Sequence, residues 1–242
     1  MFNISTYYLL LLLTLLAILF ITVKTNKLTP AGAILGGVIA TCIYGGAMFT
    51  GIAMLGLFFC LGTFATSWKI NTKKIIGVAE NSEGRRTAMQ VVANGGVAAL
   101  AGLLSCFFPV HEDLFRGAMA AAFASATADT LSSELGIVYG KKFYNILSFK
   151  KDRRGENGVV SLEGTAFGLA GSAIIATVYC IGFGWGYQFT WIIIAGTAGN
   201  IADSLMGATL ERGRYFSNDM VNVCNTLTGA LCYWIIQKIF TW

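Results

Sequence analysis

The stretch that decides the fold is Ser125–Gly136, SATADTLSSELG, which lies inside a long apolar segment and carries the carboxylates Asp129 and Glu134. An ionised carboxylate at the centre of a bilayer costs about 2.5–3.5 kcal/mol on insertion scales. A lipid-facing position does not offset that cost, so these groups are expected to face a polar cavity. At helical spacing, Asp129 shares one face with Ser125 and Ser132. The sequence therefore predicts an oxygen-rich helix face within a membrane.

The composition is that of a membrane protein. Of the 242 residues, 55% are hydrophobic and 12% are charged, and the charged fraction is about half of the ~25% usual in soluble domains. Apolar runs of about 20 residues recur along the chain, whereas the ~10-residue alternating strands of outer-membrane barrels are absent from the sequence. We therefore expect an all-α, polytopic membrane helix bundle, with residues 1–242 forming a single transmembrane domain.

About eight membrane-spanning segments are predicted, with seven as the alternative. The first lacks a basic leader and a following small-residue cleavage site, which favours an uncleaved anchor. Residues 69–87 and 140–157 are predicted to form basic loops. The approximate segments are Ile4–Val23, Pro30–Tyr44, Ile52–Trp68, Ala88–Phe108, Leu114–Tyr139, Val159–Phe183, Tyr187–Leu210 and Asn218–Phe240.

Basic residues occur almost entirely in alternate loops. The loops after the first, third, fifth and seventh segments carry 2, 5, 6 and 2 of the 17 Lys and Arg residues. The positive-inside rule places these loops in the cytoplasm and both termini outside. The net charge of +5 then reflects topology, and no nucleic-acid partner is expected, because the basic residues form no continuous groove. The expected location is the bacterial inner membrane or an equivalent membrane.

With this orientation, polar residues from five segments fall in the cytoplasmic half of the bundle and define a polar cavity that faces the cytoplasm. Alternatively, each single carboxylate lies at a helix end and extends to the water at the membrane surface, without forming part of a cavity. Carboxylate and amide oxygens suit Mg²⁺, and nearby Arg and Lys suit phosphates. Phosphoryl and nucleotidyl transfer depend mainly on positioning and charge neutralisation, so no side-chain nucleophile is required. The residues are Asn94, Asp129, Glu134, Glu163, Asn200, Asp203, Asn218, Asp219, Asn222 and Asn225.

A short internal match supports the same cavity. The tetrapeptide ADTL at Ala128–Leu131 recurs as ADSL at Ala202–Leu205, on two segments that cross in the same direction. The match suggests a duplicated helix pair, which would bring Asp129 and Asp203 to equivalent depths. The sequence has no G-x-x-x-x-G-K-[ST] motif, so a bound nucleotide would be held differently from that of a P-loop protein.

Five segments together resemble a known family. QVVANGGVAAL, SATADTLSSELG, VVSLEGTAFGLAG, GNIADSLMGATLE and NDMVNVCNTLTGAL are similar, in order and spacing, to an integral-membrane family long labelled a domain of unknown function. That family includes transmembrane protein 19 and plant phytyl-phosphate kinase. The resemblance implies a kinase that converts an isoprenoid monophosphate to the diphosphate, with CTP or another nucleotide triphosphate as donor and Mg²⁺ as cofactor. Its partners would be the lipid phosphate, the nucleotide and the bilayer.

The resemblance also suggests residue roles. We expect Asp129, Asp203 and Asp219 to be catalytic, with the first two as Mg²⁺ ligands and Asp219 as a third ligand or the holder of a ligand water. The substrate tail is expected between glycine-lined helices. The arginines of the binding set serve equally well as topology signals. The substrate- and nucleotide-binding candidates are Asn94, Glu134, Glu163, Asn200, Asn218, Asn222, Arg85, Arg86, Arg153 and Arg154.

Two other functions remain open at this point. A CTP-dependent cytidylyltransferase acting on a lipid phosphate needs the same ions and phosphates. An ion-coupled transporter also carries intramembrane carboxylates and glycine-rich helices. A transporter site lies near the membrane midplane and opens to both sides, so the depth of the carboxylates distinguishes the two classes.

Overall fold

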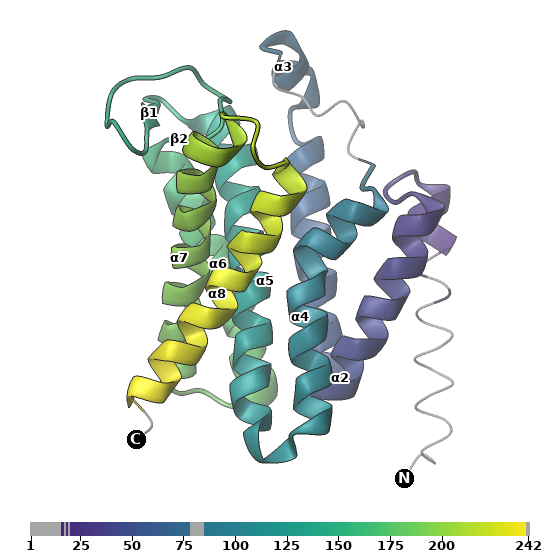
Figure 1. The fold of residues 1–242 in the computed structure, drawn as a ribbon. Coiled ribbons are helices and arrows are strands. Elements are labelled where there is room, and N and C mark those ends of the chain that lie inside the picture. Colours follow the sequence, from purple (N-terminus) through teal and green to yellow (C-terminus); the bar gives the residue numbers. More distant parts are fainter. Residues whose placement is uncertain (1–15, 17, 19, 78–84, 241–242) are drawn as a thin grey trace.

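The computed structural model describes residues 16, 18, 20–77 and 85–240, and helices make up most of it (Figure 1). The predicted first segment, Ile4–Val23, lies for the most part outside the described residues. The helices are α2 (Pro30–Ser67), α3 (Ile70–Ile75), α4 (Ala88–Phe107), α5 (Glu112–Tyr139), α6 (Leu162–Phe183), α7 (Gln188–Met206) and α8 (Asn218–Phe240), with short turns η1 (Pro109–His111) and η2 (Gly207–Glu211).

Helix α2 consists of two limbs that run in opposite directions. Thr29 caps its start by accepting a hydrogen bond from the backbone N–H of Gly32 at 3.0 Å, with Pro30 at the first helical position. A straight helix of this length would span about 57 Å. Instead, the backbone reverses at Met48 (φ 48°, ψ −140°), and Figure 1 shows the chain turning back there. The two limbs confirm the two helical segments predicted on either side of an uncharged turn.

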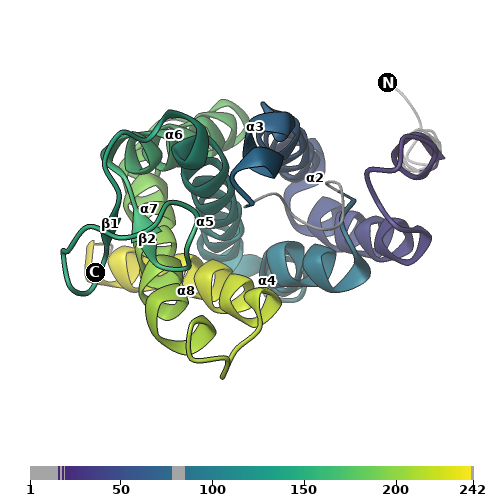
Figure 2. The same ribbon diagram turned by 90° about the horizontal axis from the view of Figure 1, so that it is seen from above.

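Helix α5 lies at the centre of the bundle, between α2, α4, α6, α7 and α8 (Figure 2). Small residues let its neighbours approach closely, as expected for helices packed in a membrane. A methyl group at Gly136 would come within 2.9 Å of the Cα of Gly164 on α6, and one at Gly199 on α7 would overlap the hydroxyl of Ser125. Because protein surrounds α5, this helix carries polar residues without exposing them to lipid.

Three of the described helices, α2, α4 and α6, are long and apolar enough to cross a membrane. Helices α5 and α7, with α8, carry most of the polar residues of the predicted cavity, which lowers their hydropathy. The architecture agrees with an all-α membrane protein. The count of eight spans, the single transmembrane domain and the placement of the termini stay predictions.

Two short strands lie where the sequence predicts the basic loop 140–157 and the start of the sixth segment at about Val159. Strands β1 (Tyr144–Asn145) and β2 (Val159–Val160) pair antiparallel, with Tyr144 opposite Val160. The predicted sixth segment therefore starts too early. Its helix begins at Leu162, after Ser161, whose hydroxyl accepts a hydrogen bond from the N–H of Gly164 at 3.1 Å. Two valines beside a turn are too short a signal to separate a strand from the first turn of an apolar helix.

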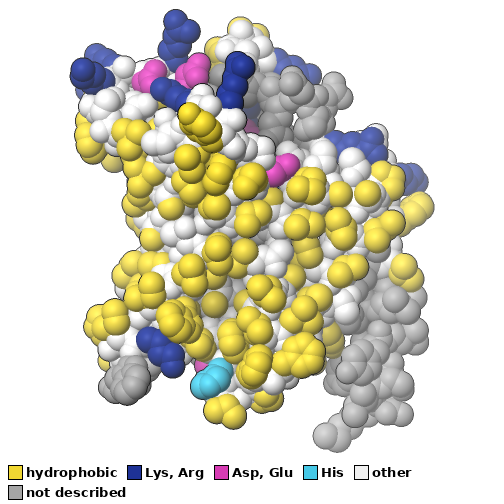
Figure 3. Space-filling view, viewed as in Figure 1, with side chains coloured by type: hydrophobic (Ala, Val, Ile, Leu, Met, Phe, Trp, Pro, Cys, Tyr) yellow, Lys and Arg dark blue, Asp and Glu magenta, His cyan; other side chains and the backbone are white. Residues whose placement is uncertain are grey.

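Basic side chains gather at the end of the bundle that carries α3 and the two strands (Figure 3). The opposite end carries fewer charges, among them Arg116, which forms an ion pair with Glu112 at 2.8 Å and donates from Nε to the carbonyl of Gly46 at 2.9 Å. The two ends of the bundle therefore differ in charge as the loops predict. Which end faces the cytoplasm stays a prediction.

Candidate active site

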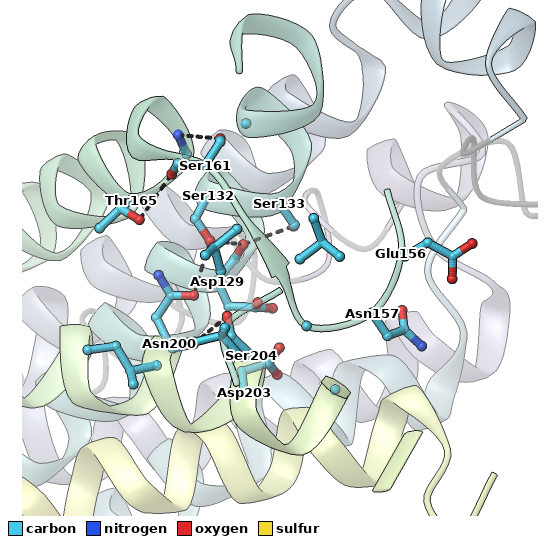
Figure 4. Close-up of a pocket in the computed structure, with 18 of the residues that line it drawn as sticks. Asp129, Ser132, Ser133, Glu156, Asn157, Ser161, Thr165, Asn200, Asp203 and Ser204 are labelled. Carbon is cyan, nitrogen blue, oxygen red and sulfur yellow. Dashed lines mark hydrogen bonds between the residues drawn. The ribbon is translucent and has the colours of Figure 1, made fainter. Parts of the chain in front are cut away.

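A polar cavity of about 230 Å³ lies at the end of the bundle that carries the strands. We call it the carboxylate cavity. Its walls come from α5, α6 and α7, and the loop before β2 and the strand itself cover it (Figure 4). The lining residues with oxygen- or nitrogen-bearing side chains include Asp129, Ser132, Ser133, Glu156, Asn157, Ser161, Thr165, Thr197, Asn200, Asp203, Ser204, Glu211 and Asn218.

The central feature of this cavity is a pair of carboxylates, Asp129 from α5 and Asp203 from α7. Both side chains line the cavity, and Figure 4 shows both turned into the same space. Oδ1 of Asp203 is buried and has no hydrogen-bond partner among the described residues. Two carboxylates that face one cavity disfavour each other's charged form, and a bound cation relieves that repulsion. Their oxygens suit Mg²⁺, which typically takes one or two protein carboxylates together with substrate phosphates.

Amide and hydroxyl groups fix the surroundings of the pair. Ser132 on α5 donates to Oδ1 of Asn200 on α7 at 3.0 Å. A methyl group at Gly168 on α6 would lie 2.8 Å from the Nδ2 of Asn200, so this glycine leaves room for the amide. Asn225 on α8 is fully buried, and its backbone carbonyl accepts a hydrogen bond from the hydroxyl of Ser125 on α5 at 3.1 Å. Four helices therefore hold the carboxylates and their neighbours in place.

The loop that covers the cavity packs directly on η2. Gly158 has a positive φ of 73°, and a methyl group there would overlap Ala208. An ion pair of 2.8 Å between Arg212 and Asp152 ties the same loop to the chain that follows η2. The backbone N–H of Arg153 and the guanidinium of Arg212 both donate to Asp152, and they lower the pKa of this carboxyl. The charged form that pairs with Arg212 is thereby favoured.

Gly158→Ala should release this loop. Alanine is strained at positive φ by about 1–2 kcal/mol, and its methyl group would also collide with Ala208. We expect limited trypsin digestion to cut at Arg153 and Arg154 several-fold faster than in the wild type. Gly77→Ala is the matched control, because Gly77 also has a φ of 73° but no heavy atom near the added methyl. Equal cleavage rates for Gly158→Ala and the wild type would contradict the packing of the loop on η2.

A second polar cavity, of about 110 Å³, lies on the other side of Asp129. We call it the arginine cavity. It shares Asp129, Ser133 and Asn218 with the carboxylate cavity, so the two spaces have a common wall. Its remaining lining comes from α2, α4, α5 and α8 and from Arg86, just before α4. These other residues are Thr63, Thr66, Arg86, Gln90, Asn94, Thr130, Glu134 and Asn222.

One wall of the arginine cavity holds a buried ion pair. Nζ of Lys73, in α3, lies 2.5 Å from Oε2 of Glu134. It also donates to the backbone carbonyls of Ala65 at 2.7 Å and Thr66 at 3.3 Å, and Lys73 is only 1% exposed. Glu134 is therefore already paired within the protein. The sequence did not distinguish Lys73 from the other lysines of a basic loop, which all resemble topology signals.

Eight of the predicted site residues line one or both cavities, and five do not. Asp219 lines neither, and the described residues contain no cluster of three His, Cys, Asp or Glu residues able to hold a metal. The described residues therefore bring two of the three predicted carboxylates, Asp129 and Asp203, to one cavity, and the role of Asp219 stays a prediction. The eight are Asn94, Asp129, Glu134, Asn200, Asp203, Asn218, Asn222 and Arg86.

Three of the other four outliers have side-chain contacts elsewhere, and the fourth is exposed. Glu163 accepts a hydrogen bond from the backbone N–H of Lys141 at 3.3 Å. Arg85 donates to the carbonyl of Leu28 at 3.4 Å. The guanidinium of Arg154 lies over the ring of Phe143 at 5.6 Å, and Arg153 is exposed.

The chain matches the family model described as integral membrane protein DUF92 over residues 13–230. Protein VTE6, chloroplastic, of Arabidopsis thaliana is 33% identical over 215 residues, which cover 86% of this chain and 64% of VTE6. A membrane protein of Synechocystis is 32% identical over 222 residues, 89% of this chain and 84% of the relative. A membrane protein of Methanocaldococcus jannaschii is 32% identical over 207 residues, 81% and 82% of the two chains.

No solved structure matches the chain. The family model covers most of the sequence, and the two membrane-protein relatives are matched over more than four-fifths of their own lengths. The chain therefore belongs to the DUF92 family of integral membrane proteins.

Proposed function

We propose that the protein is a Mg²⁺-dependent kinase that transfers a phosphoryl group from CTP or another nucleotide triphosphate to an isoprenoid monophosphate. The observation that carries the proposal is the position of Asp129. Its carboxylate belongs to the Asp129–Asp203 pair and lines both polar cavities. Two phosphate-bearing substrates can therefore approach one carboxylate site from two sides.

The reaction needs no nucleophile from the protein. An oxygen of the lipid phosphate attacks the γ-phosphorus of the nucleotide, a new P–O bond forms, and the bond from the γ-phosphorus to the bridging oxygen breaks to release the nucleoside diphosphate. Asp129 and Asp203 would hold Mg²⁺, which when bound would offset the charge of the phosphates. Arg86 and the amides of Asn94 and Asn222 would orient the phosphate in the arginine cavity.

Two kinds of comparison support this proposal. The sequence resembles a family that includes plant phytyl-phosphate kinase, and a chloroplast protein is similar over 86% of the chain. The chain covers 64% of that chloroplast protein. The identities of the substrate and the nucleotide are therefore part of our proposal.

The depth of the site favours an enzyme over a transporter. Asp203 lies eight residues before the end of the helical run formed by α7 and η2, and Asp129 lies ten residues before the end of α5. Both carboxylates therefore lie in the half of the bundle that carries the strands, on that side of the midplane. A carrier site lies near the midplane, between half-helices. The chemistry fits an enzyme that meets a nucleotide at the membrane surface.

The test is to incubate the purified protein in detergent with Mg²⁺ and geranylgeranyl monophosphate, with CTP and ATP in separate reactions. Mass spectrometry of the extracted lipid identifies the product. A geranylgeranyl diphosphate supports the kinase and names the donor. A lipid carrying CMP would replace the kinase with a cytidylyltransferase, and no product with any prenyl phosphate would contradict both enzymes.

A further inference from the structure

An apolar groove of about 120 Å³ runs between the two limbs of α2 and the first half of α4, and Ile18, Thr22 and Leu28, before α2, also line it. Figure 1 shows these helices side by side. The groove is walled by aliphatic and aromatic side chains such as Ile39, Leu55 and Phe59, and glycines at 36 and 56 open it further. A methyl group at Gly56 would meet no heavy atom within 4 Å, and one at Gly36 would meet only Val91 at 4.0 Å.

This groove continues into the arginine cavity. Arg86, Gln90 and Asn94 line both spaces, and Asp129 lies on the far side of the second one. Along this path the lining changes from hydrocarbon to a guanidinium and amides, and then to a carboxylate of the proposed metal site. A ligand that matches the path is apolar along its length and anionic at one end.

Arg86 is held at the junction of the two spaces. Its backbone N–H donates to the carbonyl of Lys27, and its carbonyl accepts from the N–H of Thr29, both at 3.0 Å. The guanidinium lies 4.9 Å from the ring centre of Phe58, and a methyl group at Gly62 would overlap it. The positive charge is thereby fixed against α2, where the groove ends.

We propose that the groove binds the hydrocarbon chain of the isoprenoid monophosphate, with the phosphate at Arg86 and facing Asp129. The identity of this ligand rests on the proposed kinase function. The arrangement leaves the larger carboxylate cavity for the nucleotide, so the two substrates enter from different sides of Asp129. The hydrocarbon chain would enter from the lipid phase, between the limbs of α2. The nucleotide would enter from the surface, beneath the loop before β2.

The groove is tested by filling it. Gly36→Leu and Gly56→Leu place bulk in open space, whereas Gly96→Leu on α4 is the matched control, because Gly96 lines none of the three spaces. The probe is a geranylgeranyl monophosphate with a photoreactive group on its chain, and labelled peptides are located by mass spectrometry. We expect label on α2 and α4, reduced at least about tenfold in the two groove variants and unchanged in Gly96→Leu.

Unlabelled geranylgeranyl monophosphate should compete for this labelling, and geranylgeraniol, which lacks the phosphate, should compete poorly. Labelling elsewhere, equal labelling of the groove variants, or equal competition by the alcohol would overturn the inference. The last result would show a general lipid crevice.

A turnover measurement separates this inference from the kinase proposal. In the groove variants, the KM for geranylgeranyl monophosphate should rise, whereas turnover of dimethylallyl monophosphate, whose chain is short, should match that of Gly96→Leu. An equal loss for both substrates would contradict binding of the chain in the groove. If the wild type turns over neither substrate but keeps the labelling pattern, the kinase proposal fails and the groove stands as a prenyl-phosphate binding site.

Discussion

Replacing Asp203 by asparagine should lower Mg²⁺-dependent turnover by at least about 100-fold, and Asp129→Asn should do the same. A metal ion contributes several kcal/mol to the stabilisation of a phosphoryl-transfer transition state, and 1.36 kcal/mol corresponds to a factor of ten in rate. Asparagine keeps the size of the side chain but removes the charge that binds the cation. The measurement is kcat as a function of Mg²⁺ concentration, with thermal unfolding in detergent to show that the variants fold.

The variant Asp219→Asn tests whether Asp219 is a magnesium ligand, as the sequence predicts, or lies outside the site, as its position in the structure indicates. The sequence places Asp219 with the magnesium ligands, but the structure leaves it outside both polar cavities. Near wild-type turnover is therefore expected for Asp219→Asn. Loss of turnover equal to that of Asp203→Asn would restore Asp219 to the site, and full activity of Asp203→Asn would remove the carboxylate pair from it.

Lys73→Met should destabilise the protein by about 3–5 kcal/mol, because it leaves Glu134 in a mostly buried site without its cation. The carboxylate is 17% exposed at the side chain, and methionine keeps much of the packing volume of lysine. The midpoint of thermal unfolding in detergent should fall clearly. Lys74→Met is the matched control, since Lys74 is exposed on the same short helix.

The double variant Lys73→Met/Glu134→Gln separates charge from packing. Removing both charges should recover most of the lost stability, because no uncompensated ion remains buried. If the double variant is as unstable as Lys73→Met, packing of the lysine stem and not the ion pair holds α3 against α5. If Lys73→Met has the stability of Lys74→Met, the buried pair contributes nothing.

The parts of the fold with strong local signals could be predicted from the sequence. Thr29 and Pro30 mark the start of α2, and the apolar runs outline α4, α6 and both limbs of α2. The turn at Met48 was located only roughly, because no charged residue interrupts the apolar run. The strands β1 and β2 were missed, since their pairing depends on residues 14 or more positions apart and each strand has only two residues.

The centre of the site could also be predicted, because a carboxylate inside an apolar helix needs a polar neighbour. Asp129 and Asp203 line the same cavity, which agrees with the equivalent depths that the match between ADTL and ADSL suggests, although the duplication itself stays a prediction. Asp219 shows the limit of this reasoning. Successive helical residues point about 100° apart, so Asn218 lines both cavities while Asp219 lines neither. The buried position of Lys73 could not be predicted, because it depends on the tertiary contact with Glu134.

Transfer of label from nucleotide to lipid tests the central claim most directly. Wild-type protein and Asp203→Asn would each be given geranylgeranyl monophosphate, Mg²⁺ and a nucleotide labelled at either the α- or the γ-phosphate. The account predicts that only the γ-label reaches the lipid, as a diphosphate, and that it does so in the wild type and not in the variant. Label from the α-phosphate, or equal labelling by the two proteins, would contradict it.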